Sequence, residues 1–196
     1  MWRSIISLSL VAIFLGGCST TRQTHPARSA NEELLISTAV HRAVAKIHPT
    51  VPKGTKIYLS ARHFSADYDT KYAIGAIQTQ LLRDGYRLVS RKSDASTVAA
   101  IRSGALSINK ESQLWLGIPS ITLPVPFSGP LNTPALNLLK RTKRTGVAEL
   151  GLTFYDAHSG KLQDYVAPIY GYSHLNRWTV LMVSWINTNL PNQPAH

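Results

Sequence analysis

The chain has 196 residues, of which 44% are hydrophobic, so it is long enough and apolar enough for one folded domain and lacks the composition of a disordered protein. Its 21 Lys and Arg residues outnumber its 10 Asp and Glu residues, and this surplus predicts attraction to anionic partners without specifying a fold. A single cysteine excludes an intrachain disulfide and a zinc site made of cysteines.

The first seventeen residues have the pattern of a secretory signal peptide. A positively charged start is followed by a mostly apolar run over residues 5–15, which is too short to span a bilayer as a helix, and then by Gly16–Gly17. This stretch looks like a bacterial lipobox, so we predict removal of residues 1–17 and attachment of lipid to Cys18. The alternative is an ordinary signal peptide, or an uncleaved anchor, with an accidental cysteine.

The mature chain is expected to begin with a tether. Residues 18–28 are polar without apolar periodicity, which is typical of a flexible, here acylated, linker. Ser19 stands where the lipoprotein sorting rule would read Asp as a retention signal, so resemblance to that rule implies the outer membrane, with the domain facing the periplasm. A single domain is then expected over residues 29–190, followed by a polar tail over residues 191–196.

The first half of this domain predicts two helices and three strands. Ser29 and Glu32 form an S-x-x-E capping box for a helix that ends near His48, before Pro49. Asp67 or Asp69 is expected to cap the second helix, and Gly85 suits the position after its end. The remaining expected elements are a strand over residues 56–60, the second helix over 70–84, and strands over 86–90 and 97–108.

The middle of the chain is apolar and rich in proline. Five prolines lie between Trp115 and Pro134, and because proline has no amide hydrogen the segment is expected to be an edge element or an extended loop. Thr133–Pro134 suits the start of a short helix. We predict that residues 114–136 cover the core, with an exposed patch for a partner as the alternative.

The last third predicts further strands. Residues 146–155 form one, residues 156–161 form a hairpin turn, residues 162–169 return, and the aromatic and β-branched residues 178–186 predict a buried strand. The fold class is therefore α/β (α+β): a single small domain with a mixed or mostly antiparallel sheet and two main helices on one face.

Four segments carry a resemblance to a known family: residues 101–108, Gly117–Pro119, residues 154–157 with Ser159–Gly160, and residues 170–174. Together they resemble a family of uncharacterised proteobacterial outer-membrane lipoproteins built on one domain of unknown function. The resemblance covers about residues 35–190 and implies the fold and an envelope location, but no activity. The order of elements is also similar to that of the amino-terminal part of TolB and of the curli secretion lipoprotein, which is an architectural likeness only.

One run of four cations is the strongest candidate binding site. Lys140, Arg141, Lys143 and Arg144 predict contact with a polyanion or a membrane surface, and the alternative is a solvated helix end. Nucleic acid is not expected, because no aromatic residues are interleaved with the cations. The run adds to the charge of four further cations: Arg83, Arg87, Arg91 and Lys92.

Catalytic and metal sites are not predicted. His63, Asp67 and Asp69 are better explained as a surface histidine and helix caps than as metal ligands. Ser173–His174 lacks the spacing of a hydrolase triad. Glu32, Glu33, Glu111 and Glu149 show no pairing typical of cooperating carboxylates, and no cofactor is expected.

We therefore expect a non-enzymatic envelope lipoprotein, a structural or adaptor component anchored through Cys18 that contacts an anionic polymer, an anionic lipid or an envelope protein. The alternative is a lipid-tethered periplasmic hydrolase or peptidoglycan-modifying enzyme. Convergence of Ser173, His174 and an acid in one pocket would favour this alternative.

Overall fold

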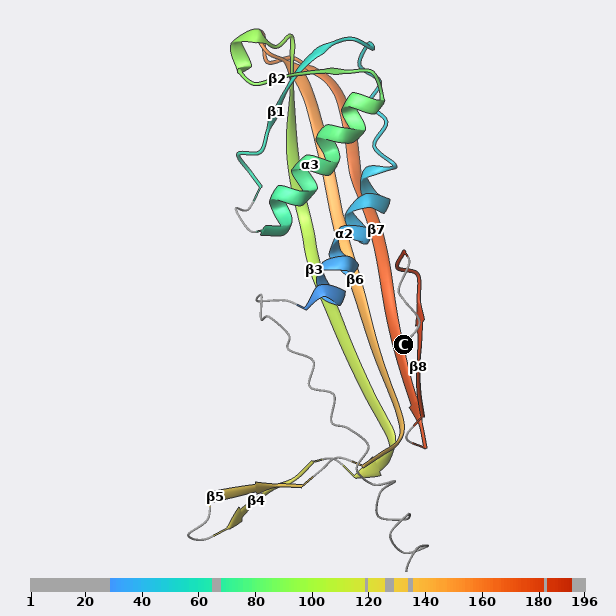
Figure 1. Ribbon diagram of the computed structural model, residues 1–196. Coiled ribbons are helices and arrows are strands. Elements are labelled where there is room, and N and C mark those ends of the chain that lie inside the picture. Colours follow the sequence, from blue (N-terminus) through green and yellow to red (C-terminus); the bar gives the residue numbers. More distant parts are fainter. Residues whose placement is uncertain are drawn as a thin grey trace, which may run out of the picture.

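The computed structural model describes residues 29–64, 68–118, 120–125, 129–133, 136–181 and 183–191. These residues form a single α+β domain, in which one face of a six-stranded mixed sheet carries two helices and a two-stranded ribbon projects from the far end (Figure 1). The predicted fold class is confirmed. The predicted signal peptide, Cys18 and the tether lie outside the described residues.

The main sheet has the strand order β2-β1-β3-β6-β7-β8. Strand β1 pairs in parallel with both β2 and β3, whereas the other pairings are antiparallel. The strands are β1 Lys56–Ser60, β2 Arg87–Val89, β3 Thr97–Ile118, β6 Leu136–Asp156, β7 Leu162–Val180 and β8 Val183–Thr188, and the ribbon is β4 Thr122–Val125 with β5 Gly129–Asn132.

Both predicted helices are present, with shifted ends. Helix α2 spans Ala30–Val44 behind the Ser29 capping box, so it ends about one turn before His48. Helix α3 spans Tyr68–Arg83 and begins two residues earlier than expected. Asp69 therefore lies within the helix and is not its cap, and Asp67 is outside the described residues.

The core lies between the two helices and one half of the sheet. Ile36 and Val40 of α2, Ile77 of α3, and Leu150 and Phe154 of β6 are almost fully buried together. Burial of such side chains contributes about 1.5–3 kcal/mol each, and it fixes both helices on this half of the sheet.

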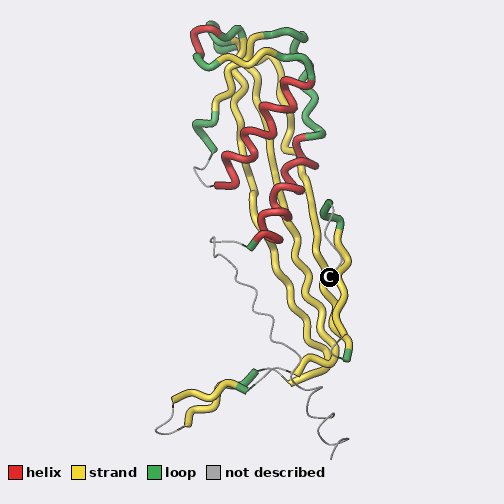
Figure 2. Tube along the Cα trace, viewed as in Figure 1, coloured by secondary structure: helices red, strands yellow, loops and turns green. Residues whose placement is uncertain are grey.

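The three central strands extend far beyond this core. Strands β3, β6 and β7 have 22, 21 and 19 residues, whereas strands of 5–6 residues are typical. Figures 1 and 2 show that the helices cover only one half of these strands. We call the helix-covered half the head, and we call the uncovered half, residues 105–118, 136–145, 174–180 and β8, the blade.

The blade accounts for most errors of the sequence prediction. The strand expected over residues 97–108 continues to Ile118, and the chain after Thr133 enters strand β6 at Leu136, where a short helix was expected. The prediction of one buried strand over residues 178–186 is wrong. The chain reverses near Leu181, which has a φ of 47°, so these residues are divided between β7 and β8. The predicted turn at residues 156–161 is confirmed, and the strands on either side of it, β6 and β7, pair as an antiparallel hairpin.

Candidate functional site

Side chains of the blade alternate between two faces of the sheet. On β6, Gly146 and Ala148 lie beneath α2, so Lys140, Thr142 and Arg144 share the face that carries the helices. We call this the helix face of the blade and the opposite one the open face.

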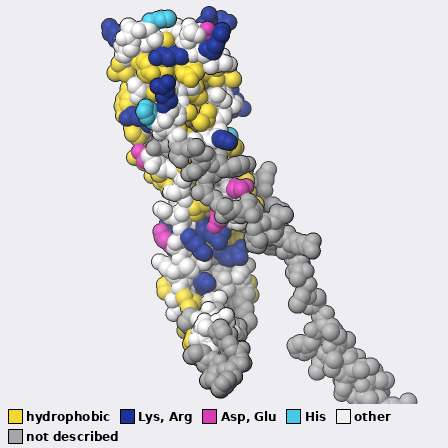
Figure 3. Space-filling view, turned by 90° about the vertical axis from the view of Figure 1, so that its left-hand side faces the viewer, with side chains coloured by type: hydrophobic (Ala, Val, Ile, Leu, Met, Phe, Trp, Pro, Cys, Tyr) yellow, Lys and Arg dark blue, Asp and Glu magenta, His cyan; other side chains and the backbone are white. Residues whose placement is uncertain are grey.

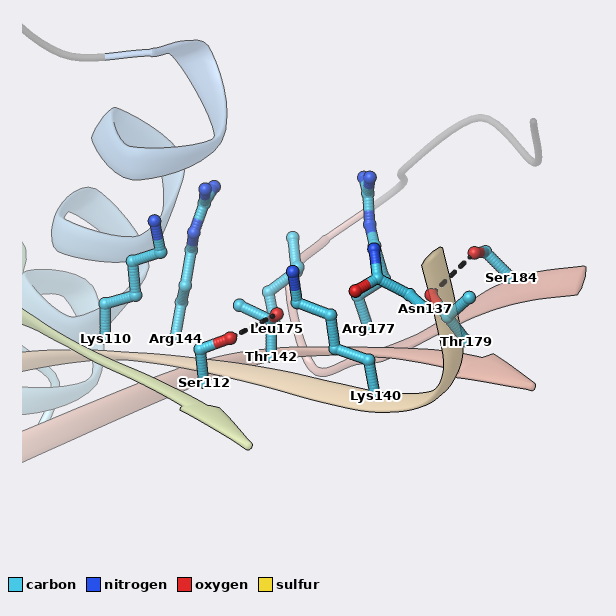
Figure 4. Close-up of a pocket in the computed structure, with 10 residues that line it drawn as sticks. All are labelled: Lys110, Ser112, Asn137, Lys140, Thr142, Arg144, Leu175, Arg177, Thr179 and Ser184. Atoms are coloured by element: carbon cyan, nitrogen blue, oxygen red, sulfur yellow. Dashed lines mark hydrogen bonds between the residues drawn. The ribbon is translucent and has the colours of Figure 1, made fainter. Parts of the chain in front are cut away.

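The helix face of the blade carries a basic groove. Lys110 from β3, Lys140 and Arg144 from β6 and Arg177 from β7 converge on a hollow of about 400 Å³ (Figure 4). The other lining residues contribute mainly hydroxyl and amide groups, and no Asp or Glu is among the lining residues that the structure describes. These other residues are Ser112, Asn137, Thr142, Leu175, Thr179 and Ser184.

Two of these cations face each other directly. Lys110 and Arg144 are opposite partners in the pairing of β3 with β6. Like charges opposed across two strands are destabilising, and a bound anion would relieve the repulsion. The Nε atom of Arg144 is buried and has no hydrogen-bond partner among the described residues. A donor of this kind is available to an acceptor brought by a ligand.

The amino-terminal end of α2 lies beside the groove. Figure 4 shows α2 next to Lys110 and Arg144, and both cations interact electrostatically with Glu32 in the first turn of the helix. The pKa of Glu32 is held below its ordinary value, mainly because the carboxylate accepts a hydrogen bond from the Ser29 amide at 3.0 Å. A helix amino terminus is itself electropositive, and at α2 the carboxylates of Glu32 and Glu33 in the first turn offset this potential.

The open face of the blade carries aromatic residues. The guanidinium of Arg141 lies 5.0 Å from the ring centroid of Trp178, which stacks on Trp115 at 5.8 Å. Trp185 lies directly opposite Trp178 in the pairing of β7 with β8. We call these three tryptophans the tryptophan cluster.

The predicted patch of four cations is therefore divided. Lys140 and Arg144 belong to the basic groove, whereas Arg141 and Lys143 point to the open face, because successive residues of a strand alternate. The alternative of a solvated helix end is wrong, since the run lies in β6. The other four cations do not join this run: they lie in the head, around α3, β2 and the short 3₁₀ helix Lys92–Asp94 (Figure 1). These cations are Arg83, Arg87, Arg91 and Lys92.

The prediction that residues 114–136 cover the core is wrong. Trp115, Leu116, Ile118, Ile121 and Leu123 are between 45% and 58% exposed. They lie at the end of the blade, away from the core, because the strands continue past the helices that bury the head. These side chains are exposed, as the alternative expected, and a partner for them stays a prediction.

Ser173 and His174 do not form a catalytic pair. The Ser173 hydroxyl is buried and donates to the Leu35 carbonyl at 2.6 Å, which joins β7 to α2. His174 follows it on the same strand and therefore faces the other side of the sheet. The convergence that would favour a hydrolase is absent at these two residues.

The metal alternative receives no support from the part of the chain that is described. His63 is exposed, the side chains of Asp67 and Asp69 lie outside the description, and no group of three His, Cys, Asp or Glu residues that could hold an ion is found among the described residues.

Among the described helices, none has the length and apolar character needed to cross a bilayer.

Sequence reasoning missed Lys110 and Arg177. Both lie in strands that continue beyond the core, and polar sequence of this kind is typical of a strand end or a connection. The available signal was the alternation along β6 and β7, which places Lys140, Thr142 and Arg144 on one face and Leu175, Arg177 and Thr179 on the same side. The side view in Figure 3 shows Lys and Arg side chains gathered on the blade below the head.

The sequence model of a family of unknown function (DUF6655) matches residues 12–161. The match includes the whole of β3 and β6, and it ends before β7. No curated protein matches the chain.

Proposed function

The chain belongs to the DUF6655 family of unknown function, and from that premise we propose that it is a non-enzymatic, lipid-anchored component of the cell envelope whose basic groove binds phosphate-bearing anionic groups. Cys18 would carry the lipid and hold the protein at the outer membrane. The envelope supplies suitable anions as lipid headgroups and as polymers.

One observation carries the binding proposal. Four cations from three strands converge on one hollow without a carboxylate among its described lining residues. Lys110 and Arg144 stand opposite each other in the pairing of β3 with β6, and Glu32, whose carboxylate interacts with both, is not among the residues that line the hollow. Several hydroxyl groups between the cations add hydrogen-bond donors of the kind that phosphate oxygens accept.

The size of the groove favours a small anionic group over a folded partner. A hollow of about 400 Å³ is at the lower end of the range for small-molecule sites and is large enough for one phosphate-bearing headgroup or one repeat of a polymer. Lys110 and Arg144 enter it from the end beside α2, and Lys140 and Arg177 enter it from farther along the strands (Figure 4). We therefore expect contact with the charged group itself and little recognition of its carrier.

The non-enzymatic part of the proposal is supported by the arrangement of Ser173 and His174. The Ser173 hydroxyl is engaged by a backbone carbonyl of α2, and the imidazole on the next residue projects from the other face. Neither residue lines the basic groove. A nucleophile and its base must be within hydrogen-bond reach of each other, which this geometry prevents.

The test is a binding titration with two soluble probes. Glycerophosphoglycerol represents a lipid headgroup and polyphosphate represents an anionic polymer, each titrated calorimetrically into the lipidated full chain in neutral detergent. Replacing Lys140 and Arg177 together by Gln should weaken binding about tenfold or more, because two charge-assisted contacts are lost. Added salt should weaken the binding of the unaltered chain as well.

A matched control separates the groove from net charge. Lys143→Gln with Lys161→Gln removes the same charge from the open face and from the hairpin turn, and it should leave both affinities nearly unchanged. Binding of glycerophosphoglycerol supports a lipid source, and binding of polyphosphate alone supports a polymer. Equal losses in the two double variants, or no binding of either probe, would refute the groove as the site.

A further inference from the structure

The end of the blade is uncharged and apolar. The 28 residues from Ser112 to Leu139 contain no Asp, Glu, Lys or Arg. The β7–β8 turn lies beside them, because the Leu181 amide donates to the Leu138 carbonyl at 2.8 Å. Leu181 and Val183 in this turn are 69% and 66% exposed. We call the described residues 114–118, 120–125 and 129–133, together with residues 181 and 183, the tip.

We propose that the tip inserts into the interfacial region of a lipid bilayer. This contact goes beyond anion binding in the groove, and it makes the blade a second membrane attachment besides the lipid on Cys18. The occupant to which the proposal commits is an anionic phospholipid bilayer.

The distribution of apolar side chains around the tip favours lipid over a protein partner. Leu114 lies on the helix face opposite Lys140, whereas Trp115 lies on the open face against Trp178, and both are exposed by 40% or more. A protein partner would cover one face of the sheet. A bilayer surrounds an inserted end on all sides, which matches exposed apolar side chains on both faces.

Aromatic and cationic residues follow the apolar end in the order found at membrane interfaces. Behind the tip lie Trp178 and Trp185 of the tryptophan cluster, and Arg141 and Arg177 lie on opposite faces in adjacent rows of the sheet. Tryptophan is favoured at the level of the headgroups, and long basic side chains reach from there to the phosphates. This order also places the basic groove next to the headgroups.

The backbone of the tip limits the depth of insertion. Unpaired amide groups are costly in hydrocarbon, so an open two-stranded ribbon cannot cross the bilayer. The ribbon reduces this cost, since β4 and β5 pair with each other and Pro124 stands opposite Pro130, neither of which has an amide hydrogen. Shallow insertion at the headgroup level is the depth that this backbone allows.

The position of α2 allows the lipid anchor and the tip to reach the same bilayer. This step rests on the proposed anchor at Cys18. Residues 18–28 can span at most about 36–40 Å when extended. The blade runs from Arg144, beside the start of α2, to Leu138 near its end, a length of about 20 Å at the rise of a strand. The tether is therefore long enough for both attachments at once.

The experiment places an environment-sensitive dye on an introduced cysteine in the lipidated full chain, reconstituted in vesicles of phosphatidylethanolamine and phosphatidylglycerol. At Ile121→Cys the emission should shift to the blue and should be quenched by lipids brominated near the headgroup. At Ser93→Cys, an exposed site in the head, neither change should occur. Water-like emission at both positions would overturn the proposal, as would a blue shift at position 121 without quenching by brominated lipid, which would indicate a protein contact such as a second copy.

A charge variant checks that apolar insertion is responsible. With the dye on Val183→Cys, the changes Ile121→Glu and Leu123→Glu should abolish the blue shift, whereas Leu82→Glu with Leu162→Glu, which adds the same charge at exposed apolar sites of the head, should leave it intact. A blue shift that survives both pairs of changes would contradict insertion. Failure of the proposed anchor is recognised separately, because an unacylated Cys18 would take up a second dye.

Discussion

Glu32 connects the stability of α2 with the charge of the groove. Its carboxylate accepts the amide hydrogen of Ser29, which would otherwise lack a partner in the first turn of the helix. The same carboxylate interacts with Lys110 and Arg144, so it offsets part of the positive potential at this end of the groove. Stability and anion affinity should thus respond to this residue in opposite directions.

Replacing Glu32 by Ala should lower the free energy of unfolding by about 0.5–1 kcal/mol near neutral pH, the usual effect of losing half of a capping box. Folding lowers the pKa of Glu32 from its ordinary value of 4.5. The contribution of Glu32 to the free energy of unfolding is therefore present above pH 4.5 and is lost as the pH falls through the lower pKa of the folded protein. Urea unfolding at pH 7 and near pH 3 should show the difference between the two proteins shrinking in acid.

The neighbouring residue provides the comparison for this prediction. Glu33→Ala removes an equal charge from the same turn but leaves the hydrogen bond between Ser29 and Glu32 in place. This change should lower the free energy of unfolding by less, only a few tenths of a kcal/mol. An equal loss in the two variants at pH 7 would show that charge at the helix terminus, and not the cap, provides the stabilisation.

The sequence predicts the helix cap at Ser29 better than it predicts the cations of the groove. The Ser29 cap could be predicted because its partner is three residues away in the sequence. The run at residues 140–144 was recognised as cationic, but its division between two faces depends on its being a strand, and charged residues in sequence give no such indication. Lys110 and Arg177 are brought to Lys140 only by the pairing of β3 and β7 with β6, which no local pattern specifies.

Among the elements, α2 determines where the groove begins. It packs directly on the backbone of β6 and β7, where Gly146 and Gly171 leave room for it. A Cβ atom at Gly171 would overlap the carbonyl of Ala39 and lie 2.6 Å from the amide nitrogen of Ala43. Real Cβ atoms do not approach backbone this closely, so the helix would have to move.

Gly171→Ala should therefore destabilise the protein by about 1–3 kcal/mol or more, the typical effect of overpacking a rigid contact. Gly75→Ala in α3 is the matched control, because a Cβ atom there meets nothing within 4 Å. That change should stabilise the protein by up to about 1 kcal/mol, since alanine is the better helix former. Thermal unfolding of both variants checks the pair, and a neutral Gly171→Ala would show that α2 can shift without cost.

The elements of the head could be predicted and those of the blade could not, for one physical reason. Periodic burial on one face produced the patterns by which α2, α3 and β1 were recognised. Beyond the core both faces of β3 and β6 meet solvent, so Asn109–Gln113 and Lys140–Arg144 show no alternation of apolar and polar residues. The turn at Leu181 contains neither Gly nor Asn, the residues that usually mark a positive φ, and it was read as the middle of a strand.

At the scale of the molecule, the residues that stabilise the fold and the residues of the proposed function lie at different ends. The head contains the helices and the main core, whereas the groove, the tryptophan cluster and the tip lie on the blade. The long central strands join the two, so the blade is held by backbone pairing more than by burial. Changes on the blade should consequently alter binding with little effect on the folding of the head.

The position of the blade relative to a membrane depends on Cys18, and acylation there is the last prediction. Cells supplied with labelled palmitate should mark the full chain and leave a Cys18→Ser chain unmarked, because the thioether forms only on that sulfur and the sequence has no other cysteine. Membrane fractionation would be a poor readout, since an uncleaved leader and the tip would both retain the variant on membranes. Mass spectrometry of the marked chain should also show that residues 1–17 are gone. A chain that keeps residues 1–17 and carries no label would be held by an uncleaved leader, and this result would contradict the lipid anchor at Cys18.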